Sequence, residues 1–428
     1  TGFDKLDLDN STYYLKDIDL EGVNAFIDFT ILNDTTATDK TVIEAVEDPS
    51  DSVPLDLRLQ DISLKDTRWN IKIGDLAIAT KAIIESFNVD MEGIDLDKQS
   101  AQITALSIVA PELSYDNLKA PKQSRGFDYG HIALTNLNID AEDIYGSADS
   151  VLIKLNEFAF KEKSGMNIQE LSGDFQYTST AFLAKDFLFK TNNTRIGNRI
   201  EVRHPNLLEI AKSLEKGRLS INLDKSYLGL QDIELLAPDL AADSYFQQVK
   251  RDRIYMNGRV EGLISNLNIP KLNIRGLNGS KLIANGRIKG LPTVERLSFD
   301  VKITELSTTK STLDKFLPDS VKQQYGIPNK VSLAGKINGS INNISTTMQL
   351  TSDIGNGNID GTFQNFVAKN ATPKYNGNFA LDKFNLQYLL KNDSLRTVSL
   401  NLAFEGEGIE PETINASAEG AVTQAYFN

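Results

Sequence analysis

The sequence contains no cysteine among its 428 residues, and its only histidines are His131 and His204. Without cysteine the chain has no disulfides, no thiolate nucleophile and no thiolate metal ligands. The two histidines lie far apart in the sequence, and neither stands in an HxxxH or HxxE spacing. We therefore expect surface or helix-capping histidines, with neither a metal site nor a catalytic triad.

Long apolar segments and dense positive charge are also missing. No apolar run reaches the roughly 18–20 residues that a membrane-spanning helix needs, and no stretch has the features of a signal peptide. The formal net charge is −13. An acidic surface repels phosphate backbones, and no basic cluster carries interleaved aromatic residues, so the sequence argues against nucleic-acid binding.

Signatures of catalysis are equally scarce. The sequence has no G-x-S-x-G elbow and no EF-hand frame. Carboxylates two residues apart, which share one face of a strand, could bind Ca²⁺ or act as acid and base. These pairs are Asp7/Asp9, Asp17/Asp19 and Glu405/Glu407. On the wet face of a sheet they are more simply solubilising charge, and we predict a protein that is not an enzyme, with no metal and no resident cofactor.

Apolar and polar residues alternate along most of the chain, which is the pattern of strands with one solvated face. A single core rarely grows beyond about 250–300 residues, so this length predicts several domains or one repetitive body. At about 12–14 residues per strand, it predicts roughly 30 strands. The residues that we expect to line the apolar face are Leu55, Leu57, Leu59, Trp69, Ile71, Ile73, Phe299, Val301, Ile303, Val331, Leu333, Leu400, Leu402 and Phe404.

Short internal repeats support a repetitive fold. The pattern L-x-[DN]-[IL]-x-[LI] occurs at residues 15–20, 59–64, 134–139 and 230–235. A second repeat pairs V-A-P-E-L at 109–113 with L-A-P-D-L at 236–240.

A third repeat, G-[RK]-[VI]-x-G, places two glycines on the same face of a strand. Glycine within a strand marks a bend, a bulge or a close backbone approach. We predict that a sheet with such a bare stripe curls there, and we reject a phosphate-binding loop because no GK[ST] follows. The strand-bending glycines are Gly258, Gly262, Gly286, Gly290, Gly335 and Gly339.

Few segments favour helix. The clearest is 205–216, with a proline in its first turn and Gly217 as a left-handed cap. Shorter helices are expected near 244–250, 310–317 and 385–391, and a short turn over 319–325. Residues 47–54 and 119–126 read as loops or linkers, yet the repeats continue on both sides of each. We therefore expect one continuous elongated β-groove over residues 1–428. The last residues resemble a strand in mid-pattern, so we expect a segment of a longer chain.

These features resemble the AsmA-like superfamily, and within it the TamB-like proteins of the bacterial translocation and assembly module. The resemblance covers residues 250–428 best. There, F-L-P-D-S and G-I-P-N-K lead into V-S-L-A-G-K-I-N-G-S at 331–340, and F-A-L-D-K-F-N-L at 379–386 precedes the G-E-G-I and A-S-A-E-G segments. The Asn- and Lys-rich, acidic composition is similar to the Bacteroidetes branch.

The resemblance implies a mainly β, elongated, curled sheet that forms an open apolar groove, the β-taco, with a few short helices. It implies a periplasmic segment of the cell envelope that carries phospholipid acyl chains between inner and outer membranes and supports outer-membrane biogenesis. Family members are anchored to the inner membrane by an N-terminal helix and meet an outer-membrane barrel partner (TamA-like); we expect both features outside this segment.

Two other functions fit parts of the pattern. A scaffold or chaperone for outer-membrane barrel assembly would use exposed sheet edges, through strand addition. A closed β-solenoid adhesin or polysaccharide enzyme would need a strict rung period, which the sequence lacks.

Overall fold

The computed structural model of the protein describes residues 2–7, 12–28, 56–74, 76–95, 99–368, 371–409 and 414–427. It is mainly β with a few short helices, and its sheet is not closed, which confirms the predicted fold class. The chain divides into two compact units. Unit 1 holds residues 1–198 with 232–240, and unit 2 holds residues 199–231 with 241–428. Leu55 and the loop expected at 47–54 lie outside the described residues.

Unit 1 is built on long strands. They are β1 (Gly2–Asp7), β2 (Thr12–Glu21), β3 (Asn24–Asp28), β4 (Asp56–Ile73), β5 (Ile78–Asp95), β6 (Ser100–Asn117), β7 (His131–Gly146), β8 (Ser150–Glu162), β9 (Asn167–Thr178) and β10 (Ala181–Thr191). From β4 to β10 each strand pairs antiparallel with the next. β2 and β3 instead run parallel to β4. The strand β11 (Arg195–Arg203) crosses the division between the units.

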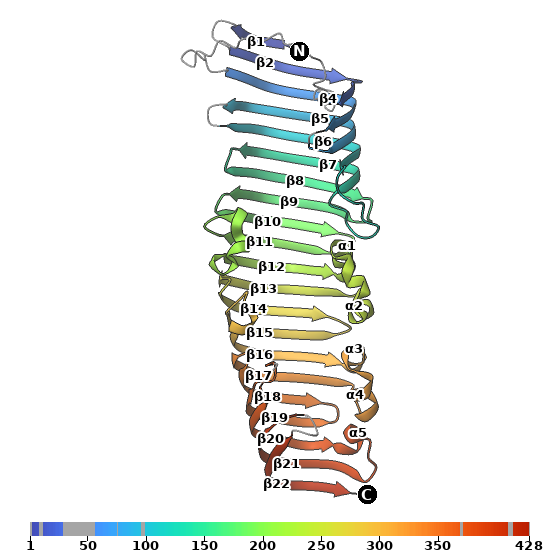
Figure 1. Ribbon diagram of the computed structural model, residues 1–428, viewed down its shortest axis with the longest axis vertical. Helices are drawn as coiled ribbons and strands as arrows, with labels where there is room; N and C mark the ends of the chain where they lie inside the picture. Colours follow the sequence, from blue (N-terminus) through green and yellow to red (C-terminus); the bar gives the residue numbers. More distant parts are fainter. Residues whose placement is uncertain are drawn as a thin grey trace, which may run out of the picture. The chain divides into compact units, whose positions relative to one another are not determined.

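Unit 2 is an antiparallel meander, in which each strand pairs with the next along the chain (Figure 1). Its strands are β12 (Arg218–Gly229), β13 (Arg253–Leu263), β14 (Asn266–Gly276), β15 (Ser280–Lys289), β16 (Ser298–Thr309), β17 (Lys330–Ser340), β18 (Asn343–Ser352), β19 (Gly355–Gln364), β20 (Lys374–Asn385), β21 (Leu395–Glu407) and β22 (Asn415–Phe427). The described strands, numbered to β22, are fewer than the roughly 30 expected. One reason is that β4, β5 and β6 have 18 residues each.

The helices are short and lie mostly at strand ends. They are α1 (Leu230–Leu236), α2 (Ser244–Val249), α3 (Lys310–Phe316), α4 (Asp319–Gln324) and α5 (Leu386–Leu390). Of these, α2, α3 and α5 lie where the sequence predicted helices, and α4 occupies the segment predicted as a short turn. The segment 205–216 does not form one α-helix but two 3-10 helices, Leu207–Lys212 and Leu214–Lys216. Gly217, predicted as a left-handed cap, has φ −66° and ψ 140° and so begins the extended backbone of β12.

The copies of two sequence repeats do not all adopt the same structure. Residues 15–20, 59–64 and 134–139 lie in β2, β4 and β7, but residues 230–235 lie in α1. Likewise 109–113 lies in β6, whereas Pro238–Ala242 forms a 3-10 helix. The helical copy at 230–235 makes tertiary contacts through its aspartate. The Asp232 carboxylate is buried and accepts hydrogen bonds from the Thr191 hydroxyl at 2.5 Å and the Asn193 amide at 2.9 Å, in the turn after β10.

Bulges bend the strands. Residues with left-handed backbone lie at register shifts, including Asn136 (φ 53°) between β7 and β8 and Lys225 (φ 47°) between β12 and β13. A bulge adds one residue to one strand and increases its local bend and twist. The alternation of faces therefore shifts phase at these positions, which fits a sheet that curls about one of its faces.

Candidate functional site

Apolar residues of unit 2 form rows that run across its strands. Each residue in a row is the direct cross-strand partner of the next; the first row runs from β12 to β22 and the second from β13 to β22. One such row is Leu223, Gly258, Leu272, Ala284, Ile303, Gly335, Met348, Ile359, Phe379, Leu402 and Gly420. The neighbouring row is Met256, Ile274, Leu282, Leu306, Leu333, Leu350, Gly357, Leu381, Leu400 and Val422. We call the face that carries these rows the apolar face of unit 2.

The opposite face, called here the polar face, has rows of polar residues. One of them is Ser220, Glu261, Asn268, Arg287, Asp300, Asn338, Ser345, Thr362, Asn376, Glu405 and Ser417. The separation is a consequence of the period of two along each strand, because successive side chains point to opposite faces.

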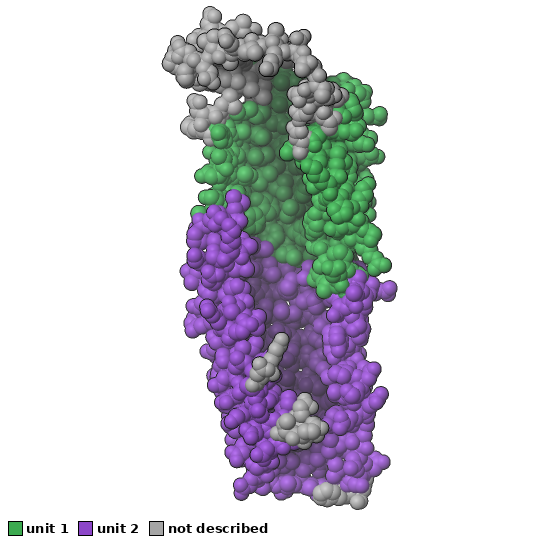
Figure 2. Space-filling view, in the orientation of Figure 1, with its two compact units in different colours: residues 1–198, 232–240 green, residues 199–231, 241–428 purple. Residues whose placement is uncertain are grey.

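Burial differs between the two faces although, among the described residues, no second sheet covers either one. Ile303 and Met348 on the apolar face are each 9% exposed, whereas Asp300 and Lys302 are exposed. The chief contacts of α3 and α5 are with single strands, β16 and β21. The apolar face is therefore sheltered by the curvature of the sheet itself. The space-filling view shows unit 2 hollowed between two rims (Figure 2). Most of the lining stays half-buried and can accept an apolar ligand.

The predicted lining residues of unit 2 fall on this face. Phe299 and Val301 lie beside Ile303 on alternate positions of β16, and Val331 shares its face with Leu333. Leu400, Leu402 and Phe404 alternate in the same way on β21. The sequence did not single out Met348, Ile359 or Phe379, which complete the rows.

An aromatic cluster lies at one side of the apolar face. Phe363 contacts Phe366 and Phe404, and Tyr375 contacts the same two rings, with all four centroid distances between 5.8 and 6.4 Å. The cluster leaves no room for a side chain at Gly406, where a Cβ would lie 2.7 Å from the Tyr375 ring. At the other end of these strands Ile354, Phe384 and Val398 form a buried core that packs with Leu386 and Leu389 of α5.

Five of the six predicted strand-bending glycines have positive φ. The values are 125° for Gly262, 155° for Gly286, 94° for Gly290, 154° for Gly335 and 121° for Gly339. Gly258 is outside that set, but a Cβ there would lie 2.7 Å from the Lys271 carbonyl oxygen. These glycines let neighbouring backbones approach closely. Two of them, Gly258 and Gly335, stand in the first apolar row.

Unit 1 has an apolar core of its own. Ala82, Ile84, Ala110, Leu137 and Phe160 are buried together on β5 to β8, and Trp69 of β4 packs against them. Ile71 and Ile73 follow Trp69 on the same face of β4. Leu57 and Leu59 also lie in β4, where their side chains are outside the described set. In the space-filling view, unit 1 is also hollowed between two rims (Figure 2).

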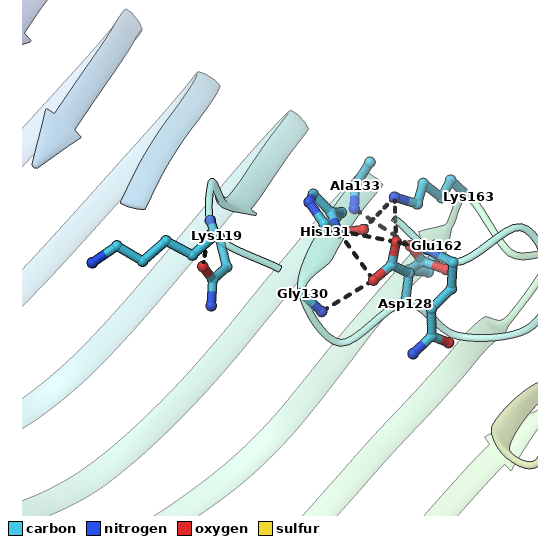
Figure 3. Close-up of polar contacts among 9 residues, drawn as sticks. Lys119, Asp128, Gly130, His131, Ala133, Glu162 and Lys163 are labelled. Carbon is cyan, nitrogen blue, oxygen red and sulfur yellow. Dashed lines mark hydrogen bonds and ion pairs between the residues drawn. The ribbon is translucent and has the colours of Figure 1, made fainter. Parts of the chain in front are cut away.

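A polar cluster closes the loop between β6 and β7 in unit 1, where residues 119–126 were predicted as a loop or linker (Figure 3). Asp128 is 2% exposed, His131 4% and Glu162 3%. The Asp128 carboxylate accepts hydrogen bonds from the backbone amides of Gln123 at 3.1 Å and Gly130 at 3.2 Å, and His131 Nδ1 lies 3.1 Å away. The ammonium group of Lys163 bonds to the His131 carbonyl oxygen.

The cluster anchors a loop and does not present a reactive group. Glu162 accepts from the backbone amides of Ala133 at 3.4 Å and Ser164 at 2.7 Å, so local backbone donors occupy both carboxylates. Burial favours the neutral form of Asp128, but the hydrogen bonds from Gln123, His131 and Gly130 outweigh it and hold the pKa of Asp128 below 3.8.

Acid should loosen this loop. Because the pKa of Asp128 is lower in the folded state, its stabilising contribution is complete above the unfolded value of 3.8 and is lost as the pH falls through the folded value.

Asparagine offers one acceptor oxygen where aspartate offers two, so Asp128→Asn should cause the same loosening at neutral pH. We expect faster amide hydrogen exchange in residues 118–130 of this variant. Asp149→Asn serves as control, since the Asp149 carboxylate is exposed and accepts a hydrogen bond from the Ser147 hydroxyl. Equal exchange in the two variants would contradict the anchoring role.

Both histidines are buried, contrary to a surface position, and each organises a local loop. His204 is 5% exposed; its Nδ1 lies 2.6 Å from the Asn206 carbonyl oxygen, and its Nε2 lies 3.0 Å from the Ser213 carbonyl oxygen and the Ser213 hydroxyl. No group of three or more potential metal-ligating side chains occurs in the described part of the chain.

The carboxylate pairs lie in separate environments. Glu405 and Glu407 are on the polar face, with Lys374 3.7 Å from Glu407. Asp17 lies beside Asp61 across β2 and β4, and burial, then the charges of Asp90 and Asp17, raise the pKa of Asp61 above 3.8. Asp9 lies outside the described residues.

Comparisons with known proteins give no relatives. No family model matches the sequence, no curated protein matches it, and no solved structure matches the fold. Over the described residues, no helix has the length and apolar character needed to cross a bilayer.

Proposed function

We propose that this protein is a segment of a bridge-like lipid-transfer protein of the bacterial cell envelope, and that phospholipid acyl chains lie along the apolar face of unit 2. The observation that carries the proposal is the unbroken succession of apolar cross-strand partners from β12 to β22. A sheet that is apolar on one face must bury that face or fill it, and no second layer of described residues covers this one.

The chemistry of the lining suits acyl chains. Each methylene group transferred from water to the apolar face contributes about 0.8 kcal/mol to the binding free energy, so a phospholipid acyl chain of ordinary length is bound firmly. The two rows defined above contain only aliphatic, methionine, phenylalanine and glycine residues, so no polar group in them would hold a chain at one position. Sliding from one strand to the next, a spacing of about 4.8 Å, exchanges one apolar contact for another. This is the behaviour that a conduit requires.

The same proposal assigns the protein to the periplasm. There it would pass lipid between the inner and outer membranes, with the membrane anchor and the barrel partner contributed by regions outside this sequence. No catalytic step is part of it, and the only small molecule involved is the lipid cargo.

Organic extraction of the purified protein, followed by mass spectrometry, tests the proposal directly. We expect phospholipid in at least stoichiometric amount, because a half-buried apolar surface of this kind retains acyl chains during purification. A folded protein that yields no lipid would contradict the conduit.

That outcome would favour the scaffold function instead, and one observation supports it. Among the described residues β22 pairs only with β21, so its other edge can add a strand from a barrel protein. Edge-blocking prolines on β22 would then be the damaging substitutions.

A further inference from the structure

A cationic depression lies at the turn that joins β14 and β15 of unit 2, and none of the residues that line it belongs to the apolar rows. Its volume is about 710 Å³, a size typical of small-molecule sites. Arg253, Arg275 and Lys281 line it, together with Tyr255, one carboxylate (Asp252) and the turn itself, residues 276–280. Three cations against one carboxylate are a marked local excess in a chain whose net charge is −13.

Two of the cations oppose each other directly. Arg275 of β14 is the cross-strand partner of Lys281 of β15, and Tyr255 of β13 is the partner of Arg275. Like charges at opposed positions destabilise a sheet. Glu305 relieves part of the repulsion, because its carboxylate lies 2.5 Å from the Lys281 ammonium group. Arg275 is exposed and makes no ion pair within the described part of the chain.

Like-charge pairing alone does not define a site. Lys302 and Lys336 are also cross-strand partners, on β16 and β17. They do not line the depression, and so they make a matched control for it.

The third cation is held by aromatic rings. The Arg253 guanidinium lies 5.1 Å from the centre of the Tyr227 ring, within the range of a cation–π contact. Tyr227 in turn packs against Tyr255, with ring centroids 5.6 Å apart. Arg253 is therefore oriented beside the Tyr255–Arg275–Lys281 row before any ligand arrives.

Helix α3 fixes the turn that forms the other wall. The Thr312 hydroxyl donates to the Leu277 carbonyl oxygen at 2.5 Å, and the Ser280 hydroxyl lies 2.8 Å from the Thr308 hydroxyl. The carboxylate in the lining is also engaged, because Lys315 of α3 lies 3.5 Å from Asp252. The depression is thus built on strands and a braced turn, as a preformed binding site requires.

We propose that this depression binds a phosphate group, whether that of a lipid headgroup or that of a soluble phosphate compound. The Arg275 guanidinium offers a planar fork of N–H donors that matches two phosphate oxygens, and Lys281 contributes a second positive charge from the opposed position. Arg253 and Tyr255 flank the ligand. The site is separate from the apolar face and does not depend on lipid transfer.

Calorimetric titration with pyrophosphate at low ionic strength tests the site. We expect the wild-type protein to bind, and the Arg275→Gln/Lys281→Gln double variant to bind at least tenfold more weakly, since hydrogen bonds to charged groups are the strong ones. The Lys302→Gln/Lys336→Gln variant should bind as the wild type does. Arg275→Lys keeps the charge but loses the fork and should fall between them, and thermal melting checks that each variant is folded.

Sedimentation with vesicles identifies the source of the phosphate. Binding to vesicles that contain phosphatidylglycerol but not to phosphatidylcholine vesicles, lost in the Arg275→Gln/Lys281→Gln variant, assigns a lipid headgroup at a membrane surface. Binding of pyrophosphate without binding to either vesicle assigns a soluble phosphate compound. Failure to bind either probe, or an equal loss in the Lys302→Gln/Lys336→Gln control, overturns the proposal.

Discussion

Leu402→Asp should purify with at least tenfold less bound phospholipid than the wild-type protein, whereas Asn401→Asp should purify with the wild-type amount. Leu402 lies on the apolar face of unit 2, between Phe379 of β20 and Gly420 of β22. A carboxylate there would have to be desolvated beneath an acyl chain, which costs several kcal/mol, and each 1.4 kcal/mol is a factor of ten.

Asn401→Asp is a closely matched control for Leu402→Asp. It is the preceding residue of the same strand, it is exposed on the polar face, and its cross-strand partners are Ala380 and Ala421. The two variants therefore add the same charge one residue apart, on opposite faces. Comparing their lipid content by extraction and mass spectrometry separates an effect on the apolar face from one of net charge. Equal lipid in two folded variants would remove the apolar face from any role in lipid binding.

Which residues share a face of the sheet was the feature most readily predicted from the sequence. Alternation at 299–303 and 400–404 placed those residues correctly on one side of β16 and β21, because the period of two along a strand survives as long as no bulge intervenes. The rows across strands were not accessible, since they depend on register. Ile359 partners Phe379 only because β19 and β20 pair without a shift, and nothing local in either strand specifies that.

A shared sequence pattern does not fix the local structure here. Residues 59–64 and 230–235 share one pattern, yet the first lies in β4 and the second in α1. The helical copy makes a buried bond between Asp232 and Thr191, a tertiary contact that no local pattern reveals. Tertiary context overrides weak propensity in such short segments.

The cationic depression could not be found from sequence for the same reason. Arg253, Arg275 and Lys281 come from three strands, and each looks like an ordinary solvated charge in its own alternating run. Asp128 and His131 are three residues apart, which is a visible signal, but burial of the pair depends on how the loop before β7 packs.

The second large effect is expected at Gly335, on stability. We predict that Gly335→Ala lowers the free energy of unfolding by about 3 kcal/mol. Gly335 has φ 154°, a backbone conformation that is essentially restricted to glycine and costs other residues about 1–3 kcal/mol. An added Cβ would also lie 2.0 Å from the Thr347 carbonyl oxygen and 2.8 Å from the Met348 Cα. Forcing the neighbouring strand aside costs about 1–3 kcal/mol more.

Gly146→Ala is the matched control for this substitution. Gly146 also lies in a strand, but its φ is not positive and a Cβ there would meet nothing within 4 Å. Its replacement should change stability by no more than about 0.5 kcal/mol. Denaturant unfolding followed by circular dichroism measures both variants. If Gly335→Ala unfolds at the same midpoint as Gly146→Ala, close approach of β17 and β18 is not what this glycine provides, and the bare positions in the apolar rows need another explanation.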